Sequence, residues 1–552
     1  MKHALALCTV LLLSVNSLSQ HQHSAGDSKP ATMIAGLGEV HHKVSTSNPE
    51  AQRFFDQGLA LVYGFNHEEG IRSFNKATEL DPQLAMAHWG VALALGPNIN
   101  MDVDPDREKA AYEAIQRALK LAPKASEAER DYINALAKRY SNDPKADLKK
   151  LNADYRVAMR EVTKRYPDDP DAATLYAESI MLLSPWQYWL SDGRPGPGTL
   201  EMVAVLETVL RRDPQHLGAN HYYIHAVEAS PNPEWALPSA QRLKVLAPAA
   251  GHLVHMPAHI DIRSGNYDAA ARSNAYAAEA DREYFKLTGQ QGMYPMMYYS
   301  HNLHFLAVAH AMQGRFSDST RAANQLDAHL RTFLQRDATS ADPFLAVIDT
   351  FLPTTTLILI RFHRWDEILK LQTPDKKLTA STILWHAGRA LAYASTGRVE
   401  DAEKERSLMQ AALKSFPAER PYGFNKASDV FAIPQELVNA RIALAKKDRT
   451  AGLGALKKAV QLEDALSYDE PEDWYIPSRE ALGGQLMIAG DYKEAEKVFR
   501  AELEKHRRNG RALFGLMESL KAQGRTDVAD FVRRQFEDAW QNADIKLRIE
   551  DL

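Results

Sequence analysis

The chain has 552 residues, a formal net charge of −5 at pH 7, 45% apolar residues and 25% charged residues, which is ordinary for a folded globular protein. The slightly acidic balance argues against a protein that binds nucleic acid or anionic membranes broadly. Cys8 is the only cysteine, which excludes disulfides, thiol catalysis and thiolate metal sites from the rest of the chain.

The first 19 residues have the pattern of a secretory signal peptide. Lys2 gives a short basic region, Ala4 to Val15 is a brief apolar stretch, and Ser17-Leu18-Ser19 is a small-x-small cleavage site. We therefore expect cleavage after Ser19 and export to the periplasm or outside the cell. No later uncharged apolar run reaches the length of about 18 residues that predicts a transmembrane helix, so we expect none in the mature chain.

Three segments are predicted after the signal peptide. Residues 20–38 are mostly small and polar and predict a flexible arm. Residues 39–540 predict one continuous helical solenoid, followed by a C-terminal tail at 541–552. The first repeat is visible from Asn48 to Pro82, where two blocks of helical periodicity are separated by a turn at Gly64–Asn66 and ended by Asp81-Pro82.

This unit resembles the tetratricopeptide repeat. With Ala51 as position 1, the family's small residue at position 8 is Gly58, its aromatic at 24 is Phe74, its alanine at 27 is Ala77 and its proline at 32 is Pro82. Further units in this frame begin at Leu217, Gly251 and Ser300, and later turns lie at Gly397, Gly490 and Gly524. The resemblance implies an all-α solenoid of degenerate helical hairpins, coiled as a right-handed superhelix, whose first helices line a concave groove. Phrases such as HMPAHI and EPEDWYIPSRE are also similar to a bacterial group of exported tetratricopeptide proteins of unassigned activity.

Histidines gather in the middle of the chain, far more densely than an even spread of the chain's 20 would give. Spacings of three and four residues put them on one face of each helix. In the tetratricopeptide family, positions 2, 5, 9 and 12 face the groove, and the clustered histidines fall on these positions. Neighbouring first helices lie about 8–10 Å apart, so their imidazoles could share one ion.

The pattern predicts a polyhistidine pocket for a divalent transition metal such as zinc, copper or iron. The candidate ligands are His221, His225, Glu228, His252, His255, His259, His301 and His304. The alternative is a groove of satisfied polar residues that holds an anionic or peptide ligand. Pro257 should kink or restart the helix between His255 and His259.

Two other stretches are candidates for the same pocket. His67 lies in the phrase FNHEE at a predicted helix start, where ordinary capping is the alternative. The phrase YDEPEDWYIPSRE at 468–480 would suit a loop that grips a ligand, or a capped helix entry with its tryptophan in the core. Its candidate residues are Glu470, Asp473, Trp474, Tyr475 and Arg479. His506 stands alone in the sequence and receives no role.

Two functions remain open at this stage. The first is an exported scaffold whose groove binds a protein, a peptide or a metal, with no nucleic-acid partner. The alternative is a metal-dependent enzyme, hydrolytic or oxidative, that uses Glu228, Glu470 or Asp473 as a general base. The sequence leaves undecided whether the protein is an enzyme, which metal or partner it takes, and its oligomeric state, since a fold alone does not define a function.

Overall fold

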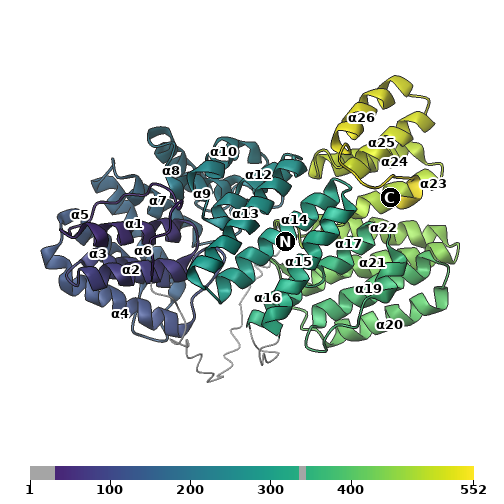
Figure 1. Ribbon diagram of the computed structural model, residues 1–552. Coiled ribbons are helices and arrows are strands. Elements are labelled where there is room, and N and C mark those ends of the chain that lie inside the picture. Colours follow the sequence, from purple (N-terminus) through teal and green to yellow (C-terminus); the bar gives the residue numbers. More distant parts are fainter. Residues whose placement is uncertain (1–30, 335–342) are drawn as a thin grey trace, which may run out of the picture.

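The computed structural model describes residues 31–334 and 343–552, and these form an elongated array of helices that runs in chain order from one end of the molecule to the other (Figure 1). The predicted signal peptide, 1–19, lies outside the described residues, as does the first part of the predicted arm. The predicted all-α class is confirmed. Among the described residues the only paired strands are a short antiparallel hairpin, in which β1 (Pro421–Tyr422) pairs with β2 (Asn425–Lys426).

The helices follow one another with short connections. The N-terminal part contains α1 (Pro49–Tyr63), α2 (His67–Leu80), α3 (Ala85–Leu95), α4 (Pro105–Leu121), α5 (Glu127–Leu136), α6 (Leu148–Arg165), α7 (Pro170–Met181) and α8 (Thr199–Arg212). The middle contains α9 (Leu217–Val227), α10 (Leu237–Leu246), α11 (Gly251–His255), α12 (Pro257–Arg263), α13 (Tyr267–Thr288), the π-helix η4 (Pro295–Tyr299), α14 (Ser300–Met312), α15 (Phe316–Leu334), α16 (Pro343–Phe351) and α17 (Thr354–Arg361). The C-terminal part contains α18 (Trp365–Lys370), α19 (Thr379–Ser395), α20 (Val399–Ser415), α21 (Ala427–Ala445), α22 (Arg449–Asp464), α23 (Ser478–Ile488), α24 (Tyr492–Lys505), α25 (Gly510–Ala522) and α26 (Thr526–Ala539). Short 3-10 turns complete the array at η1 (Ala122–Lys124), η2 (Ala137–Arg139), η3 (Pro233–Ala236) and η5 (Ile549–Asp551).

Local sequence signals set the ends of the first hairpin. The Asn48 side chain accepts hydrogen bonds from the first backbone amides of α1, and Pro49 occupies the first helical position, where its missing N–H has no cost. Asn66 caps α2 in the same way, and the helix stops at Asp81 before Pro82. The two helix blocks predicted from periodicity are therefore confirmed.

The fold is a tetratricopeptide-like stack of helical hairpins, and its packing rule is seen at both ends of the chain. Phe74 of α2 is fully buried, and glycines of α1 and α3 let both helices approach its ring. A Cβ atom would come within 2.6 Å of that ring at Gly58 and within 2.4 Å at Gly90. Phe499 of α24 has the same environment, between Gly483 of α23 and Gly515 of α25. Each aromatic ring therefore joins its own repeat to the next one.

The predicted boundary between arm and solenoid is wrong for residues 31–38. The backbone N–H of Ile34 donates to Gln57 Oε1 (2.7 Å), and Ala249 N–H donates to the Gly36 carbonyl (2.9 Å). Ile34 and Leu37 are buried against the helical array. Two apolar side chains within a polar segment are enough to pack this stretch onto the first repeats.

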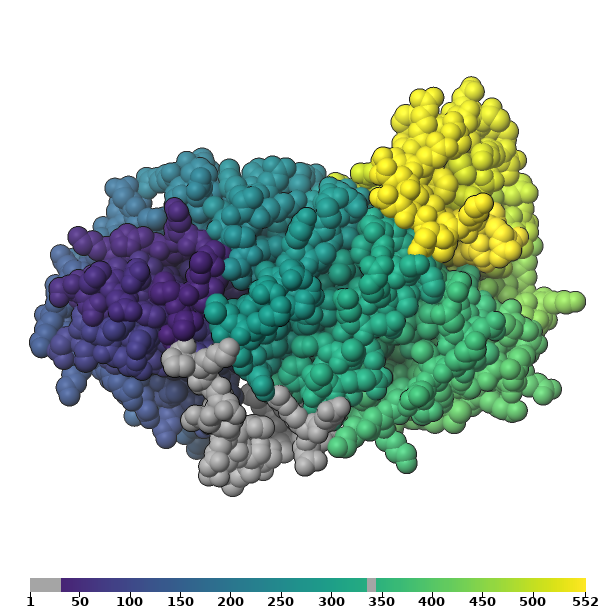
Figure 2. All heavy atoms as spheres, viewed as in Figure 1, coloured from purple at the N-terminus to yellow at the C-terminus, as the bar shows by residue number. Residues whose placement is uncertain are grey.

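The C-terminal segment after α26 also packs onto the stack. Leu552 is buried near Gly484 of α23, and the Arg511 guanidinium donates to the Asp551 carbonyl. Figure 2 shows the middle of the chain as a filled surface between the N-terminal and later repeats, whereas the last repeats stand out from the body.

One stretch of the described residues, Phe344–Arg361, is long and apolar enough by composition to cross a membrane. It comprises α16 and α17, separated by a turn, and 67% of it is buried inside the protein. Its apolar side chains are therefore used in the core between α14, α15 and α19.

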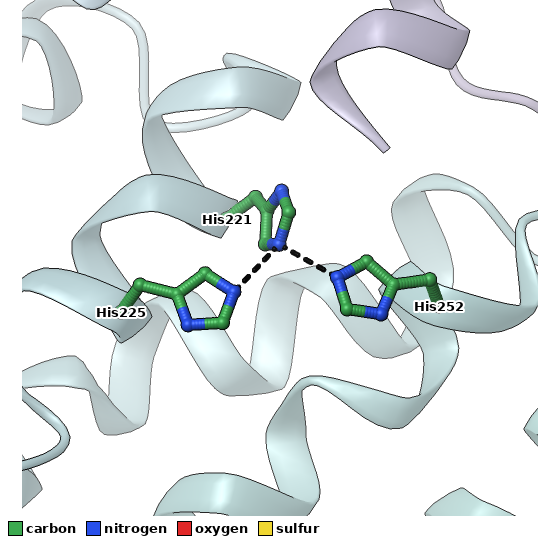
Figure 3. A group of neighbouring side chains, drawn as sticks. All are labelled: His221, His225 and His252. Carbon is green, nitrogen blue, oxygen red and sulfur yellow. Dashed lines mark hydrogen bonds between the residues drawn. The ribbon is translucent and has the colours of Figure 1, made fainter. Parts of the chain in front are cut away.

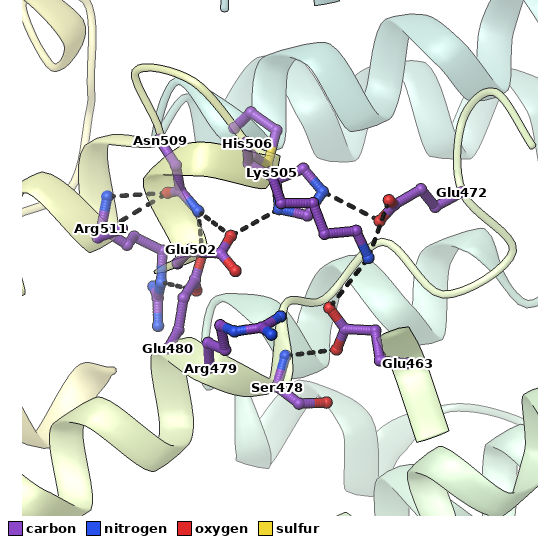
Figure 4. Close-up of polar contacts among 12 residues, drawn as sticks. Glu463, Glu472, Ser478, Arg479, Glu480, Glu502, Lys505, His506, Asn509 and Arg511 are labelled. Atoms are coloured by element: carbon purple, nitrogen blue, oxygen red, sulfur yellow. Dashed lines mark hydrogen bonds and ion pairs between the residues drawn. The ribbon is translucent and has the colours of Figure 1, made fainter. Parts of the chain in front are cut away.

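A half-buried ion-pair network holds the loop 465–477 against α24 (Figure 4). His506 contacts Glu502 through Nδ1 (2.6 Å) and Glu472 through Nε2 (3.0 Å), and Lys505 Nζ lies 3.1 Å from Glu472. Glu480 of α23 is bound in turn by Arg361 and Arg511. His506, which received no role from the sequence, is thus a structural residue whose partners are distant in the chain.

The glycines beside Phe499 provide a test of the hairpin packing. Gly483→Ala should lower the free energy of unfolding by about 1–3 kcal/mol, because its Cβ would lie 2.4 Å from the Phe499 ring. Gly454→Ala, in an exposed position of α22 with open space around it, should instead raise stability by about 0.5–1 kcal/mol through helix propensity. Urea unfolding midpoints measure both, and equal effects of the two changes would contradict this packing.

The network around Glu472 predicts a pH dependence of stability. Burial opposes the charge on His506, but Glu472 and Glu502 raise its pKa from 6.5 to about 10. The contribution of His506 to the stability of the folded protein is therefore complete below pH 6.5 and is lost as the pH rises towards 10. Burial would raise the pKa of Glu472, yet Lys505 and His506 lower it, so its contribution is present above pH 4.5 and is lost in acid.

Glu472→Gln should therefore destabilise the protein most between pH 4.5 and 6.5, and progressively less towards pH 10. Glu494→Gln breaks an exposed pair with Lys497 on the same helix and should have little effect at any pH. Unfolding midpoints across this range give the comparison. A loss of stability in Glu472→Gln that is independent of pH would rule out the ionic explanation.

Candidate metal centre

Three first helices in the middle of the chain carry the clustered histidines. Helix α9 holds His221 and His225, and Glu228 stands at its C-cap. Pro257 divides the next first helix into α11, with His252 and His255, and α12, with His259, so the predicted restart at the proline is confirmed. Helix α14 holds His301 and His304.

The first triad consists of His221, His225 and His252, and its ring nitrogens point at one another (Figure 3). His221 Nε2 lies 3.1 Å from His225 Nε2 and 3.1 Å from His252 Nε2. Two imidazoles bound to one tetrahedral ion at about 2.0–2.1 Å have their nitrogens about 3.4 Å apart. The first triad therefore has the spacing of a three-histidine metal site.

The second triad consists of His255, His259 and His301. His255 Nε2 lies 2.7 Å from His259 Nε2 and 3.1 Å from His301 Nε2. Together the two triads form what we call the histidine cluster. The rings of His225 and His259, one from each triad, have centroids 5.6 Å apart. The predicted convergence on one pocket is thus observed, but the imidazoles gather around two centres instead of one.

Oxygen acceptors hold the outer ring nitrogen of the central histidine in each triad. His221 Nδ1 donates to the Tyr63 carbonyl (2.6 Å), and His255 Nδ1 donates to Asn274 Oδ1 (2.7 Å). The Asn274 amide orientation is fixed because its Nδ2 donates to the Ala270 carbonyl. Carbonyl oxygens only accept hydrogen bonds, so the proton of each neutral ring sits on Nδ1 and the Nε2 lone pair faces the centre of its triad.

Glu228 connects the two triads. Its Oε1 lies 2.8 Å from His225 Nδ1, and its Oε2 contacts His259 Nδ1. Burial would raise the pKa of Glu228, but His259 and His225 hold it down at about 2. Burial would likewise lower the pKa of His259, yet Glu228 raises it above its ordinary value. A single buried carboxylate therefore orients one ligand of each triad.

Burial keeps the other imidazoles in the neutral form that binds metals. It lowers the pKa of His221, His252, His255 and His301 well below the ordinary value, and neighbouring histidines add to the effect. His225 is shifted downward as well, mainly by burial and against the pull of Glu228. A site of neutral nitrogen donors with a nearby carboxylate suits zinc, copper or iron.

Most of the histidine cluster is enclosed by other side chains, and only His301 is half-buried. The five cluster histidines of α9, α11 and α12 are only 0–2% exposed. The Phe65 ring lies 4.5 Å from His221 and 5.5 Å from His252, and Trp186 meets the edge of His225. Tyr298 of η4 packs on His252, with ring centroids 4.8 Å apart. Aromatic side chains from three separate segments thus pack directly on the histidines.

Two predicted histidines do not join the cluster. His304 lies one turn beyond His301, but its ring packs against Phe351 and Tyr475, and burial lowers its pKa to about 4. His67 is buried at the start of α2, where burial and nearby arginines lower its pKa to about 3. Phe65, two residues earlier, is the member of that phrase which reaches the triads.

The loop 468–480 contributes one carboxyl near the cluster. Glu470 accepts a hydrogen bond from Tyr468 Oη (2.8 Å); burial raises its pKa to about 7, while His259 acts in the opposite direction. Trp474 is a core residue, and Tyr475 is buried beside His304.

Two charged candidates from this loop are engaged elsewhere. Asp473 accepts from Asn425 Nδ2 (2.8 Å) at the β hairpin, and Arg479 pairs with Asp464. Trp474 is packed in the core, and Asp473 and Arg479 pair with Asn425 and Asp464, which favours the structural alternative; the ligand-gripping roles of these residues stay a prediction.

A further group of metal-type ligands, His42, Asp169 and Asp171, lies at the N-terminal side. Its atoms are engaged with one another and with tyrosines: His42 Nδ1 lies 2.8 Å from Asp171, and Tyr63 Oη donates to the same carboxylate. Because the Tyr63 carbonyl accepts from His221, this group supports the first triad.

Comparisons with known proteins identify no family for this chain. No family model matches the sequence, and no curated protein matches it. Among solved structures, yeast Tom70 is 12% identical with a TM-score of 0.30, covering 88% of this chain and 90% of its own. Human IFIT1, solved as a dimer with m7Gppp-AAAA, is 13% identical with a TM-score of 0.32 over 91% and 92% of the two chains. The Cut9–Hcn1 hetero-tetramer gives 12% identity and a TM-score of 0.32 over 89% and 76%. With scores this low, the description of this chain as a tetratricopeptide-like solenoid rests on the packing of its own hairpins.

Proposed function

We propose that this protein is an exported helical-repeat scaffold that binds transition-metal ions in the histidine cluster. The observation that carries the proposal is the direction of the rings: all six Nε2 atoms face the two triad centres, while oxygen acceptors hold the Nδ1 atoms of His221, His225, His255 and His259. Five of the six imidazoles are buried, and without an ion their Nε2 atoms would have only one another as partners.

The donor set supports zinc, copper or iron as the bound metal. Three imidazoles leave a coordination position open, as in catalytic and transport sites, whereas closed structural zinc sites use four protein ligands. A protein or peptide partner, which the repeat architecture also favours, would bind outside the enclosed cluster. Export is supported by the leader pattern. The lack of cysteine after Cys8 leaves imidazoles as the strong ligands for a transition metal.

A metal-dependent enzyme, hydrolytic or oxidative, is the second candidate function. Glu470 favours it, because this buried carboxyl interacts electrostatically with His259 and could accept a proton from metal-bound water. Glu228 is less suited to that role, since both its oxygens are engaged by ligand histidines. Metal-loaded protein that turns over no ester, phosphoester or phenol would count against this candidate, and full activity of Glu470→Gln would remove the role of that carboxyl.

Metal binding can be tested with a matched pair of changes on α14. His301→Ala should lower the metal content and weaken binding at the second triad at least about tenfold, because it removes a ligand of that triad. His304→Ala, one helical turn away, should change it less than about twofold, since its ring packs outside both triads. Untagged protein purified without chelators would be loaded with zinc, copper or iron and analysed for metal content and affinity, with circular dichroism as the check on folding.

Two outcomes would contradict the proposal. One is untagged wild-type protein that takes up none of these metals. The other is an equal loss of metal in His301→Ala and His304→Ala, which would place the binding site away from the triads.

A further inference from the structure

The two triads are built by the same rule applied to successive repeats. In the unit that begins at Leu217, positions 5 and 9 are His221 and His225, and position 2 of the following unit is His252. In the unit that begins at Gly251, positions 5 and 9 are His255 and His259, and position 2 of the following unit is His301. Each triad therefore takes two imidazoles from one first helix and a third from the next.

The geometry repeats together with the sequence. The position-5 histidine is the centre of each triad: its Nε2 contacts both other Nε2 atoms at 2.7–3.1 Å. Its Nδ1 donates to a carbonyl-type oxygen, from Tyr63 in the first triad and from Asn274 in the second. The position-9 histidine turns its Nδ1 to Glu228 in both triads. The matched contacts at positions 5 and 9 make the two triads similar sites.

The series stops after two triads. The third unit carries His304 at position 5, but position 9 is Val308, and the His304 ring packs among aromatic side chains. The linking carboxylate also occurs once: position 12 is Glu228 in the first of these units and Ile262 in the second. Glu228 therefore lies at the junction of the two sites and serves both.

We propose that the histidine cluster is a two-ion centre, with one copper or zinc ion in each triad and Glu228 as a carboxylate shared by the outer spheres of both. This inference rests on the proposed metal-binding function and goes beyond it in stoichiometry and in the role of Glu228. Each ion would have three imidazole ligands and an open position for water or a small exogenous ligand. Carboxylates behind ligand histidines fix the ring orientation and increase ligand basicity, so one residue here tunes two ions.

Metal counting on wild type and two single-triad variants tests the two-ion arrangement. Metal-free protein would be titrated separately with copper and zinc, and bound ions counted by native mass spectrometry. We expect two ions in the wild type and in His304→Ala, but one tight ion in His252→Ala, which disables the first triad, and one in His301→Ala, which disables the second.

Glu228→Gln tests the shared carboxylate. It keeps the size of the side chain and removes the charge, so it should retain two sites and weaken both about 10–100-fold. A loss confined to one site, or no loss, would overturn the shared role. Circular dichroism and thermal unfolding exclude simple misfolding of the variants.

The other outcomes separate the two proposals. One ion in the wild type, lost with either His252→Ala or His301→Ala, would overturn the two-ion centre and leave metal binding intact. No bound metal at all would overturn the proposed function itself. If a variant does not fold, the wild-type ion count still decides between one ion and two.

Discussion

The buried carboxylate of Glu228 is the interaction on which the middle of this molecule depends. An isolated carboxylate in a protein interior is strongly disfavoured, and its charge has to be balanced by partners that donate hydrogen bonds. His225 and His259 provide these partners from two successive repeats. Because each ring is fixed through Nδ1, its Nε2 must face inward, and the other cluster histidines complete the two centres around them.

The repeat stack supplies the precision that this arrangement needs. Helices α9, α11 with α12, and α14 are first helices of neighbouring hairpins, so the position-2 histidine of one helix reaches the position-5 histidine of the helix before it. In other repeats of the stack, glycines packed on buried rings allow the helices to approach closely, as at Phe74 and Phe499. The Asp171 carboxylate, held by His42 and Tyr63, anchors the first repeat beside α9 and so places the Tyr63 carbonyl against His221.

Helical periodicity and the tetratricopeptide frame predict much of this from the sequence alone. They give the hairpins, the groove-facing positions of the histidines and the helix restart at Pro257. They do not give the division into two triads, because that depends on ring orientations set by acceptors outside the motif. A backbone carbonyl such as that of Tyr63 leaves no trace in the sequence. Asn274, by contrast, is visible in the sequence, because it occupies position 24 of its unit, where Phe74 and Phe499 lie in their own units. A polar residue at such a core position indicates a buried hydrogen-bond partner.

Enclosure of the cluster was also beyond the sequence. Phe65, Trp186 and Tyr298 come from three separate connections, and only the folded chain brings them over the histidines. The loop 468–480 was ambiguous because acidic, aromatic and arginine residues serve both ligand sites and buried ion-pair networks. Lys505 and His506, which lie a full repeat further along the chain, pair with Glu472 of this loop and indicate a structural role for it.

The central claim is that the six imidazoles hold metal ions at two centres. Anomalous diffraction from crystals of the metal-loaded protein, recorded at the absorption edge of the added metal, tests it most directly. The account predicts two peaks, one within each triad and about 2.0–2.1 Å from its three Nε2 atoms. A single peak between the triads, or no peak near these nitrogens in protein that carries metal, would contradict it.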